Sequence, residues 1–240
     1  FLLDALLVIG KAKAAMGNDT GSVKTFQFAA HLHPKRPEPF ACLSETYYQL
    51  GDFTQAAAYC ITAICLYPED AYFGMLKKIM DKSRKKFVSQ WVQREVYPLT
   101  TALNYFEITA KEKSPWRIYQ EADMEVHGYY DTTGIVRPNE KTNIRYLELY
   151  AWKKMLADTK KSLFPFARAM EAMGFLDCYI LVSCFHQDLY FQFKDFAEKN
   201  TTKLQDYFYV LLNWEDKKFD KVREKFYVKE EREKKEVIKK

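Results

Sequence analysis

The sequence predicts an all-α fold, and three observations support this prediction. The 240 residues include only 8 glycines and 8 prolines, so few residues favour turns and long helices are favoured. Apolar residues recur at helical spacing along most of the chain, and the alternation of apolar and polar residues that is typical of a β-strand is not sustained in any segment. We expect TPR-like helical hairpins over residues 1–98, followed by a C-terminal helical region over residues 99–240.

Two consecutive units of 34 residues, 3–36 and 37–70, repeat the same pattern. In the second unit, apolar residues form one stripe on each of two predicted helices. Gly51 supplies the turn between these helices, because glycine tolerates the backbone angles that end a helix. Pro68 ends the second helix, because the residue before a proline is displaced from helical angles. Pairs that lie 34 positions apart are Gly17 and Gly51, Phe26 and Cys60, Ala29 and Ala63, and Pro34 and Pro68.

The pattern of the second unit resembles the tetratricopeptide repeat (TPR) family. The resemblance covers about 70 of the 240 residues and implies helical hairpins stacked as an α-solenoid. The first unit departs from the pattern, since Lys13 stands where the family has an aromatic residue and Ser22 where it usually has alanine. The matching positions of the second unit are Phe40, Leu43, Tyr47, Gly51, Phe53, Ala56, Cys60, Ala63 and Pro68.

A capping helix is predicted directly after the second unit. Its apolar stripe would cover the last hydrophobic face of the array. Two repeats alone are too few to bury a stable core. We therefore expect either further repeats before Phe1 or docking of the C-terminal region onto these two. The stripe consists of Tyr72, Met75, Leu76, Ile79 and Met80.

The chain after Lys82 is predicted to be helical throughout, with one loop-like linker at 131–142. Pro115 occupies a position that suits the first turn of a helix, and Pro165 interrupts another helical stretch. The predicted helices cover 83–96, 99–113, 115–130, 144–156, 175–199 and 203–226.

The composition argues against several classes of protein. Hydrophobic residues make up 48%, which is too high for a disordered chain. The net charge is only +5, and the last 26 residues mix 11 basic with 8 acidic side chains, whereas a nucleic-acid-binding protein usually concentrates basic residues on one face. No segment approaches the roughly 20 apolar residues that cross a bilayer. We therefore expect no membrane span and no nucleic-acid partner.

The cysteines indicate a reducing environment. Their number is odd and their spacing is not paired, so a disulfide framework is not expected. Most fall at apolar positions of predicted helices, where a free cysteine behaves as a small hydrophobic residue. An intracellular location, in the cytoplasm or inside an organelle such as the mitochondrion, follows as the expectation. The five are Cys42, Cys60, Cys65, Cys178 and Cys184.

No arrangement of residues predicts catalysis, so we expect a protein that is not an enzyme and that carries no cofactor and no metal. His31 and His33 are two residues apart and cannot face one metal from a helix. Cys178 and Cys184 are six residues apart on a predicted helix, which is a poor spacing for tetrahedral zinc. Both are expected in the core, and the nearby His186 is expected on the polar face of the helix. The carboxylates Glu121, Asp123 and Glu125 are expected on solvated faces.

One face of the predicted array corresponds to the peptide-binding groove of those TPR proteins that bind the carboxyl end of chaperones. Those proteins use a clamp of lysine, asparagine and arginine, and capture of a carboxylate needs several converging donors. Of the corresponding residues here, only Lys11 fits, so chaperone binding through a carboxylate clamp is not expected. These residues are Leu7, Lys11, Cys42, Tyr72 and Leu76.

The remaining residues of this face would let an apolar helix or an extended segment lie against the array. The alternative is that the C-terminal helices of the chain fill the same face. The predicted groove residues are Lys11, Ala14, Ala41, Glu45, Tyr48 and Gln49.

The function that this pattern favours is that of a non-enzymatic helical-repeat scaffold or adaptor subunit, which mediates protein–protein interactions with other subunits of a larger assembly. The alternative is a helical-repeat RNA-binding protein, since helical repeats also bind RNA. The small and dispersed charge excess argues against that alternative. An enzyme with its active site in 99–240 is a third possibility, without any residue pattern that supports it.

Overall fold

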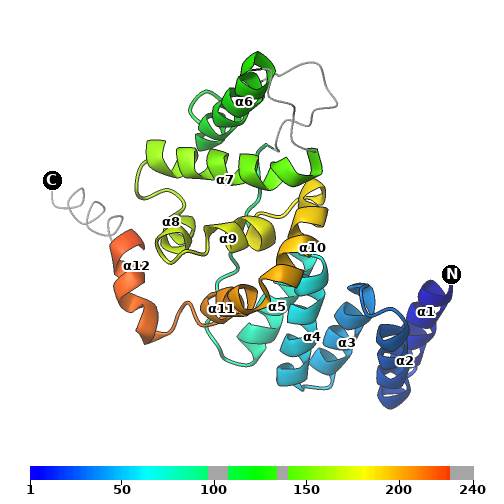
Figure 1. The fold of residues 1–240 in the computed structure, drawn as a ribbon. Coiled ribbons are helices and arrows are strands. Elements are labelled where there is room, and N and C mark those ends of the chain that lie inside the picture. Colours follow the sequence, from blue (N-terminus) through cyan, green and yellow to red (C-terminus); the bar gives the residue numbers. More distant parts are fainter. Residues whose placement is uncertain (97–107, 134–139, 228–240) are drawn as a thin grey trace. The chain divides into compact units, whose positions relative to one another are not determined.

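The computed structural model describes residues 1–96, 108–133 and 140–227 (Figure 1). Within these residues the chain forms α-helices and two short 3-10 helices but no strand, so the all-α prediction is confirmed. The chain divides into two compact units, Phe1–Trp91 and Val92–Lys240. The predicted domain boundary at residue 98 lies outside the described residues. None of the described helices combines the length and the apolar character that are needed to cross a bilayer.

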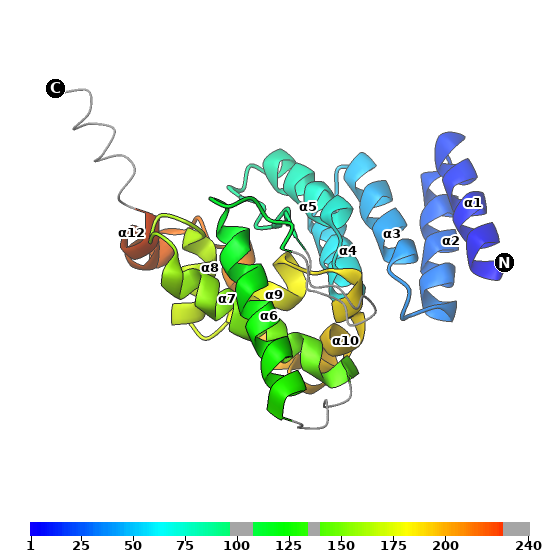
Figure 2. The ribbon, with the colours of Figure 1, turned by 90° about the horizontal axis from the view of Figure 1, so that it is seen from above.

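Unit 1 is a series of helices in which each one packs against the next along the chain (Figure 2). Each of the two 34-residue sequence units contains one pair of these helices, and a fifth helix follows where a capping helix was predicted. The tetratricopeptide solenoid itself stays a prediction. The helices are α1 (Leu2–Ala15), α2 (Asp19–Leu32), α3 (Glu38–Gln49), α4 (Phe53–Leu66) and α5 (Asp70–Lys82).

The two turns inside these helix pairs use the same local chemistry. Gly17 and Gly51 have φ of 73° and 79°, values that residues with a Cβ rarely adopt. The residue after each glycine is the N-cap of the next helix: the Asn18 side chain accepts a hydrogen bond from the Gly21 amide, and the Asp52 side chain accepts one from Gln55. The chain therefore reverses its direction twice through the same pair of features, a glycine with positive φ followed by an N-cap residue, at positions 34 apart.

The core of unit 1 requires close approach of its helices. A Cβ on Gly10 of α1 would lie 2.3 Å from the ring of Phe26 on α2, so no larger residue fits at position 10 without a shift. The Ser44 hydroxyl on α3 donates a 2.8 Å hydrogen bond to the carbonyl of Ala56 on α4. Small residues thus bring both pairs together, as expected from Ala and Ser at helix contacts.

The helix predicted over 83–96 is not formed. Arg84 has φ of 58° and ends the turn that follows α5, and the chain then runs without helix to Val96. Within unit 2 the Val92 amide donates a 2.8 Å hydrogen bond to the Ser183 carbonyl. Contacts with residues far along the chain therefore replace the helical hydrogen bonds that the local sequence would allow.

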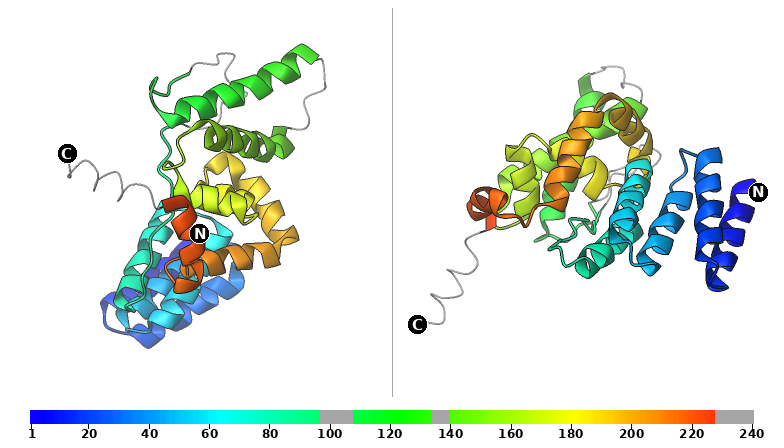
Figure 3. Two further views of the ribbon diagram at one scale, coloured as in Figure 1. Left: turned by 90° about the vertical axis from the view of Figure 1, so that its left-hand side faces the viewer. Right: turned by 90° about the horizontal axis from the view of Figure 1, so that it is seen from below.

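Unit 2 is also helical, and its longest helices, α6 and α7, pack against each other (Figure 3). Pro115 begins α6, as predicted. The elements are α6 (Pro115–Thr133), α7 (Glu140–Asp158), α8 (Pro165–Ala172), α9 (Leu176–Ser183), η1 (Gln187–Leu189), α10 (Tyr190–Lys199), α11 (Thr201–Leu212), η2 (Lys217–Phe219) and α12 (Asp220–Tyr227).

Several predicted boundaries in unit 2 are wrong. The two long aromatic helices predicted over 175–199 and 203–226 are each divided, at 184–189 and at 213–219. Trp214, in the second division, is buried against Phe166 of α8, with ring centroids 4.9 Å apart. The segment 108–113 is not helical. The rest of the helix predicted over 99–113, and 134–139 of the predicted linker, lie outside the described residues.

The core of unit 2 contains many edge-to-face contacts between aromatic rings. Trp152 of α7 has no exposed surface and meets Trp116, Phe164 and Tyr179 with centroid distances of 5.4 to 5.7 Å and nearly perpendicular rings. Edge-to-face contacts of this kind add to the stabilisation from burial alone. The many aromatic residues of the sequence are therefore largely core residues in this unit.

We predict opposite effects for two substitutions of exposed glycines in unit 1. Gly51→Val should destabilise the protein by about 1–3 kcal/mol, because valine fits a positive φ poorly although the space around it is open. Gly74→Ala in α5, where φ is ordinary and the space is also open, should stabilise by about 0.4–1 kcal/mol. Urea unfolding measures both. An unchanged free energy of unfolding for Gly51→Val would contradict the role assigned to this turn.

Candidate functional site

A hollow of about 430 Å³ lies on unit 1 where α1 and α3 approach each other. Its floor is apolar, since Phe26 and Cys42 are buried, and its rim is polar, since Lys11, Glu45 and Gln49 are exposed. This arrangement can hold an apolar group while polar side chains surround it. The lining residues are Lys11, Ala14, Ala15, Phe26, Cys42, Glu45, Thr46 and Gln49.

A second hollow of about 350 Å³ adjoins the first and shares Lys11, Cys42 and Glu45 with it. We call the two hollows together the groove. All of its lining residues belong to unit 1. The second hollow is lined by Lys11, Glu38, Ala41, Cys42, Ser44, Glu45, Cys60, Tyr72 and Met75.

The structure brings together five of the six groove residues that the sequence analysis named. Lys11, Ala14, Glu45 and Gln49 line the first hollow, and Ala41 lines the second. The sixth, Tyr48, does not line either hollow. The centroid of its ring lies 5.8 Å from the centroid of the Phe53 ring. Tyr48 itself is half-buried. Helical spacing alone did not show that Tyr48 turns toward the N-terminus of α4, where an aromatic partner is available.

The titratable groups of the groove favour binding over chemistry. Burial raises the pKa of the Cys42 thiol and raises that of Cys60 to about 12, so both stay protonated at neutral pH and are poor nucleophiles. A side-chain hydrogen bond from Arg36 lowers the pKa of Glu38 against a smaller opposing effect of burial. Glu38 is therefore an anion that already has a partner.

Two of the positions that correspond to the chaperone-type clamp hold leucines that pack in the protein. Leu76 has no exposed surface, and Leu7 packs on the cluster formed by Phe26 and Leu43. Among the residues that line the groove, Lys11 is the one cation. A single lysine does not supply the several donors that a carboxylate clamp needs.

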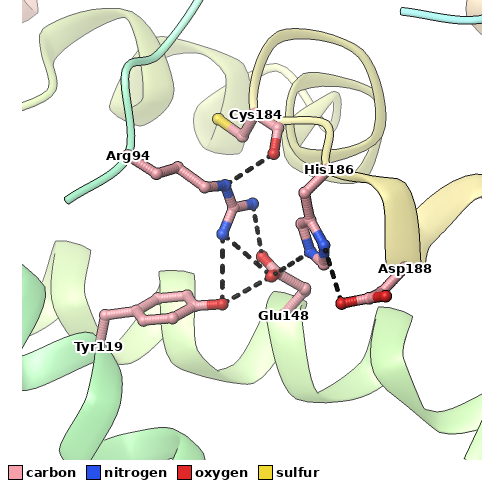
Figure 4. A network of polar contacts seen from close by, with 6 residues as sticks. All are labelled: Arg94, Tyr119, Glu148, Cys184, His186 and Asp188. Atoms are coloured by element: carbon pink, nitrogen blue, oxygen red, sulfur yellow. Dashed lines mark hydrogen bonds and ion pairs between the residues drawn. The ribbon is translucent and has the colours of Figure 1, made fainter. Parts of the chain in front are cut away.

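A second polar arrangement, which we call the Glu148 cluster, is buried in unit 2 (Figure 4). Arg94 binds Glu148 through two parallel hydrogen bonds of 2.9 and 3.0 Å. The Tyr119 hydroxyl donates a 2.6 Å bond to the same carboxylate, and Nε2 of His186 lies 3.0 Å from it. The third arginine donor, Nε, reaches the Cys184 carbonyl at 2.8 Å.

The Glu148 cluster is closed to solvent. The side chains of Arg94 and Glu148 are 1% and 0% exposed. Burial alone would raise the pKa of Glu148, but the charge of Arg94 and the hydrogen bonds from His186 and Arg94 lower it to about 2. Glu148 and Arg94 are therefore charged at neutral pH. This carboxylate, which contacts Arg94, Tyr119 and His186 and is closed to solvent, holds these residues together.

The sequence analysis missed this cluster. Its members come from the segment after α5, from α6, from α7 and from the turn between α9 and η1. Partners in it are separated by 25 to 90 residues along the chain, so no motif spacing indicates it. His186 is buried and faces Glu148, which corrects its expected place on a polar face.

The other residues considered for chemistry are placed as follows. Cys178 and Cys184 are buried and carry no disulfide. Asp123 is only 1% exposed, so the expectation that it lies on a solvated face is wrong, whereas Glu121 and Glu125 are exposed as expected. Among the described residues, no group of three or more His, Cys, Asp or Glu side chains is placed to hold a metal ion.

Comparisons of this chain with protein-family models, with curated proteins and with solved structures gave no match. The function is therefore argued from the geometry of the groove and of the Glu148 cluster.

We predict that breaking the buried ion pair is costly. Glu148→Leu should destabilise the protein by about 3–5 kcal/mol, because it leaves the charge of Arg94 buried without its partner. The double variant Arg94→Met with Glu148→Leu should lose less than the sum of the two single variants. As a control, Arg117→Met removes an exposed pair with Glu121 and should cost less than about 1 kcal/mol. Additive single effects at 94 and 148, measured by chemical unfolding, would argue against the pairing.

The low pKa of Glu148 predicts a specific acid sensitivity. Its folded value of about 2 lies below the usual 4.5, so between these values the unfolded chain binds the proton more readily than the folded one. The contribution of Glu148 to stability is therefore complete above pH 4.5 and is lost as the pH falls toward 2. Unfolding free energies of the protein and of Glu148→Gln, measured from pH 6 to pH 3, should differ in slope. Equal slopes would show that Glu148 is not the titrating group.

Proposed function

We propose that this chain is a non-enzymatic helical-repeat scaffold or adaptor subunit that binds other proteins within a larger assembly. The observation that carries the proposal is the groove of unit 1. Five residues chosen from the sequence for a binding face line two adjoining hollows, with an apolar floor and a polar rim. This combination suits a polypeptide, which offers both apolar side chains and hydrogen-bonding groups.

The charges at the rim favour a protein over RNA. Glu38 and Glu45 line the groove beside the single cation Lys11, so the acidic groups outnumber the basic ones. A phosphate backbone would be repelled here, whereas RNA binding needs converging cations. A peptide segment can place an apolar side chain over Phe26 and a basic or amide group toward Glu45.

The absence of a reactive role for the Glu148 cluster also supports a binding function. Its carboxylate has no exposed surface, whereas a general acid or base has to reach its substrate. The cluster instead connects four segments of unit 2, as is expected of a structural role.

We predict that the chain elutes from gel filtration of a native extract at a size well above that of the monomer and that ribonuclease does not change this size. Reversal of the rim charges by Lys11→Glu with Glu45→Lys should shift it toward the monomer, because both side chains are exposed on the groove. Lys24→Glu with Glu69→Lys is the matched control, since these residues are also exposed but do not line the groove.

Two results would contradict the proposal. A decrease in size after ribonuclease treatment would favour the RNA-binding alternative. A rim variant that keeps the native size, with unchanged circular dichroism, would show that the groove is not the binding surface.

A further inference from the structure

The end of α5 and the turn after it carry a dense cluster of positive charge. Residues 77–86 contain six lysine or arginine side chains, and all six are exposed. The same stretch contains a single acidic residue, Asp81, whose carboxylate is paired with Lys77 at 2.9 Å. We call the other five cations the basic turn, which consists of Lys78, Lys82, Arg84, Lys85 and Lys86.

The charge of the basic turn has no partner within the part of the chain that the structure describes. None of the five side chains donates a hydrogen bond or forms an ion pair there. They are also not needed to cap α5, because its last carbonyls accept hydrogen bonds from the backbone amides of Ser83, Arg84 and Lys85. The five cations are therefore available to an anion outside the described residues.

The position of Arg84 is unusual for an arginine. The Arg84 amide donates a hydrogen bond to the Asp81 carbonyl, and the Lys85 amide donates one to the Met80 carbonyl. The same pair of hydrogen bonds follows α1, α3 and α8, and in each of them the residue in the place of Arg84 is a glycine with positive φ. Arg84 has φ of 58°, which costs free energy for a residue with a Cβ. A residue that is kept in such a conformation points to a function of its side chain.

We propose that the basic turn binds an acidic segment of a partner protein. Carboxylates of such a segment supply the anions that the five cations lack, and the guanidinium of Arg84 suits a carboxylate because it can donate two parallel hydrogen bonds. The inference goes beyond the function proposed above, which rests on the groove alone. The groove is lined by other residues of unit 1, so the two surfaces can be tested separately.

Three observations favour a polypeptide over RNA or a lipid surface. Lys86 and Val88 are exposed and make no hydrogen bond with another backbone group in the described part of the chain, so their main-chain groups can pair with a partner main chain. The one aromatic side chain of residues 77–90, Phe87, is buried and offers no surface on which a base could stack. Val88 is the one exposed apolar side chain of this stretch, whereas membrane-binding surfaces bury a larger apolar area.

A fluorescein-labelled synthetic peptide in which glutamate and serine alternate tests the proposal with the 240-residue chain. Fluorescence anisotropy at physiological ionic strength should show saturable binding, and the same peptide with glutamine in place of glutamate should not bind. Lys85→Glu with Lys86→Glu should weaken binding at least tenfold, which corresponds to about 1.4 kcal/mol. Lys160→Glu with Lys161→Glu is the matched control, since these adjacent lysines are also exposed and the change in net charge is the same. This control should bind like the parent chain.

Arg84→Gly separates binding from folding. Glycine suits the positive φ at this position, so the melting temperature of the variant should rise. The loss of the guanidinium should weaken binding of the acidic peptide about threefold or more. A lower melting temperature together with unchanged peptide binding would show that Arg84 supports the fold and would overturn its assignment to the binding surface.

The groove variant Lys11→Glu with Glu45→Lys should bind the peptide normally, so failure of the groove and failure of the basic turn are distinguishable. The inference is overturned if the parent chain shows no saturable binding, or if both lysine-pair variants weaken binding equally, since the attraction would then be one of net charge. It is also overturned if labelled oligouridine or phosphatidylserine vesicles bind more tightly than the peptide and Lys85→Glu with Lys86→Glu abolishes that binding. The occupant would then be RNA or a membrane.

Discussion

The carboxylate of Glu148 has no exposed surface, and a buried charge is tolerated only with a cation and hydrogen-bond donors around it. In unit 2 this requirement ties together four parts of the chain. Arg94 supplies the cation, and its Nε donates a hydrogen bond to the carbonyl of Cys184. Tyr119 and His186 both contact Oε1 of Glu148. Arg94 lies in a segment without helix, and His186 lies in the turn between α9 and η1.

Unit 1 is organised differently, by local chemistry repeated at a fixed interval. A glycine with positive φ and a capping side chain reverse the chain after α1 and again after α3. Small residues such as Gly10 and Ser44 then set how closely the helices approach. The groove is a consequence of this geometry, since α1 and α3 lie on the same side of α2 and leave a polar-rimmed space above Phe26.

Under the proposed scaffold function, the two units would contribute differently. Unit 1 offers a groove that its helices line. Unit 2 contains the most strongly coupled polar network of the described residues and a core of perpendicular aromatic rings. Neither the raised thiol pKa values of the groove nor the engaged carboxylate of Glu148 favours reactivity.

The sequence by itself determined the all-α class, the two helix pairs of unit 1 with the helix that follows them, the glycine turns, and five of the residues that line the groove. These features depend on neighbours within about four residues or on a visible 34-residue period. Tertiary structure alone decided the orientation of Tyr48, the extended course of residues 85–96, the divisions at 184–189 and 213–219, and the burial of Asp123 and His186. Arg94, in the segment 85–96, and His186 are both held by Glu148, which lies 54 and 38 residues away from them. Local spacing carries no information about such partners, and the cost of an unmatched buried charge outweighs local helix preference.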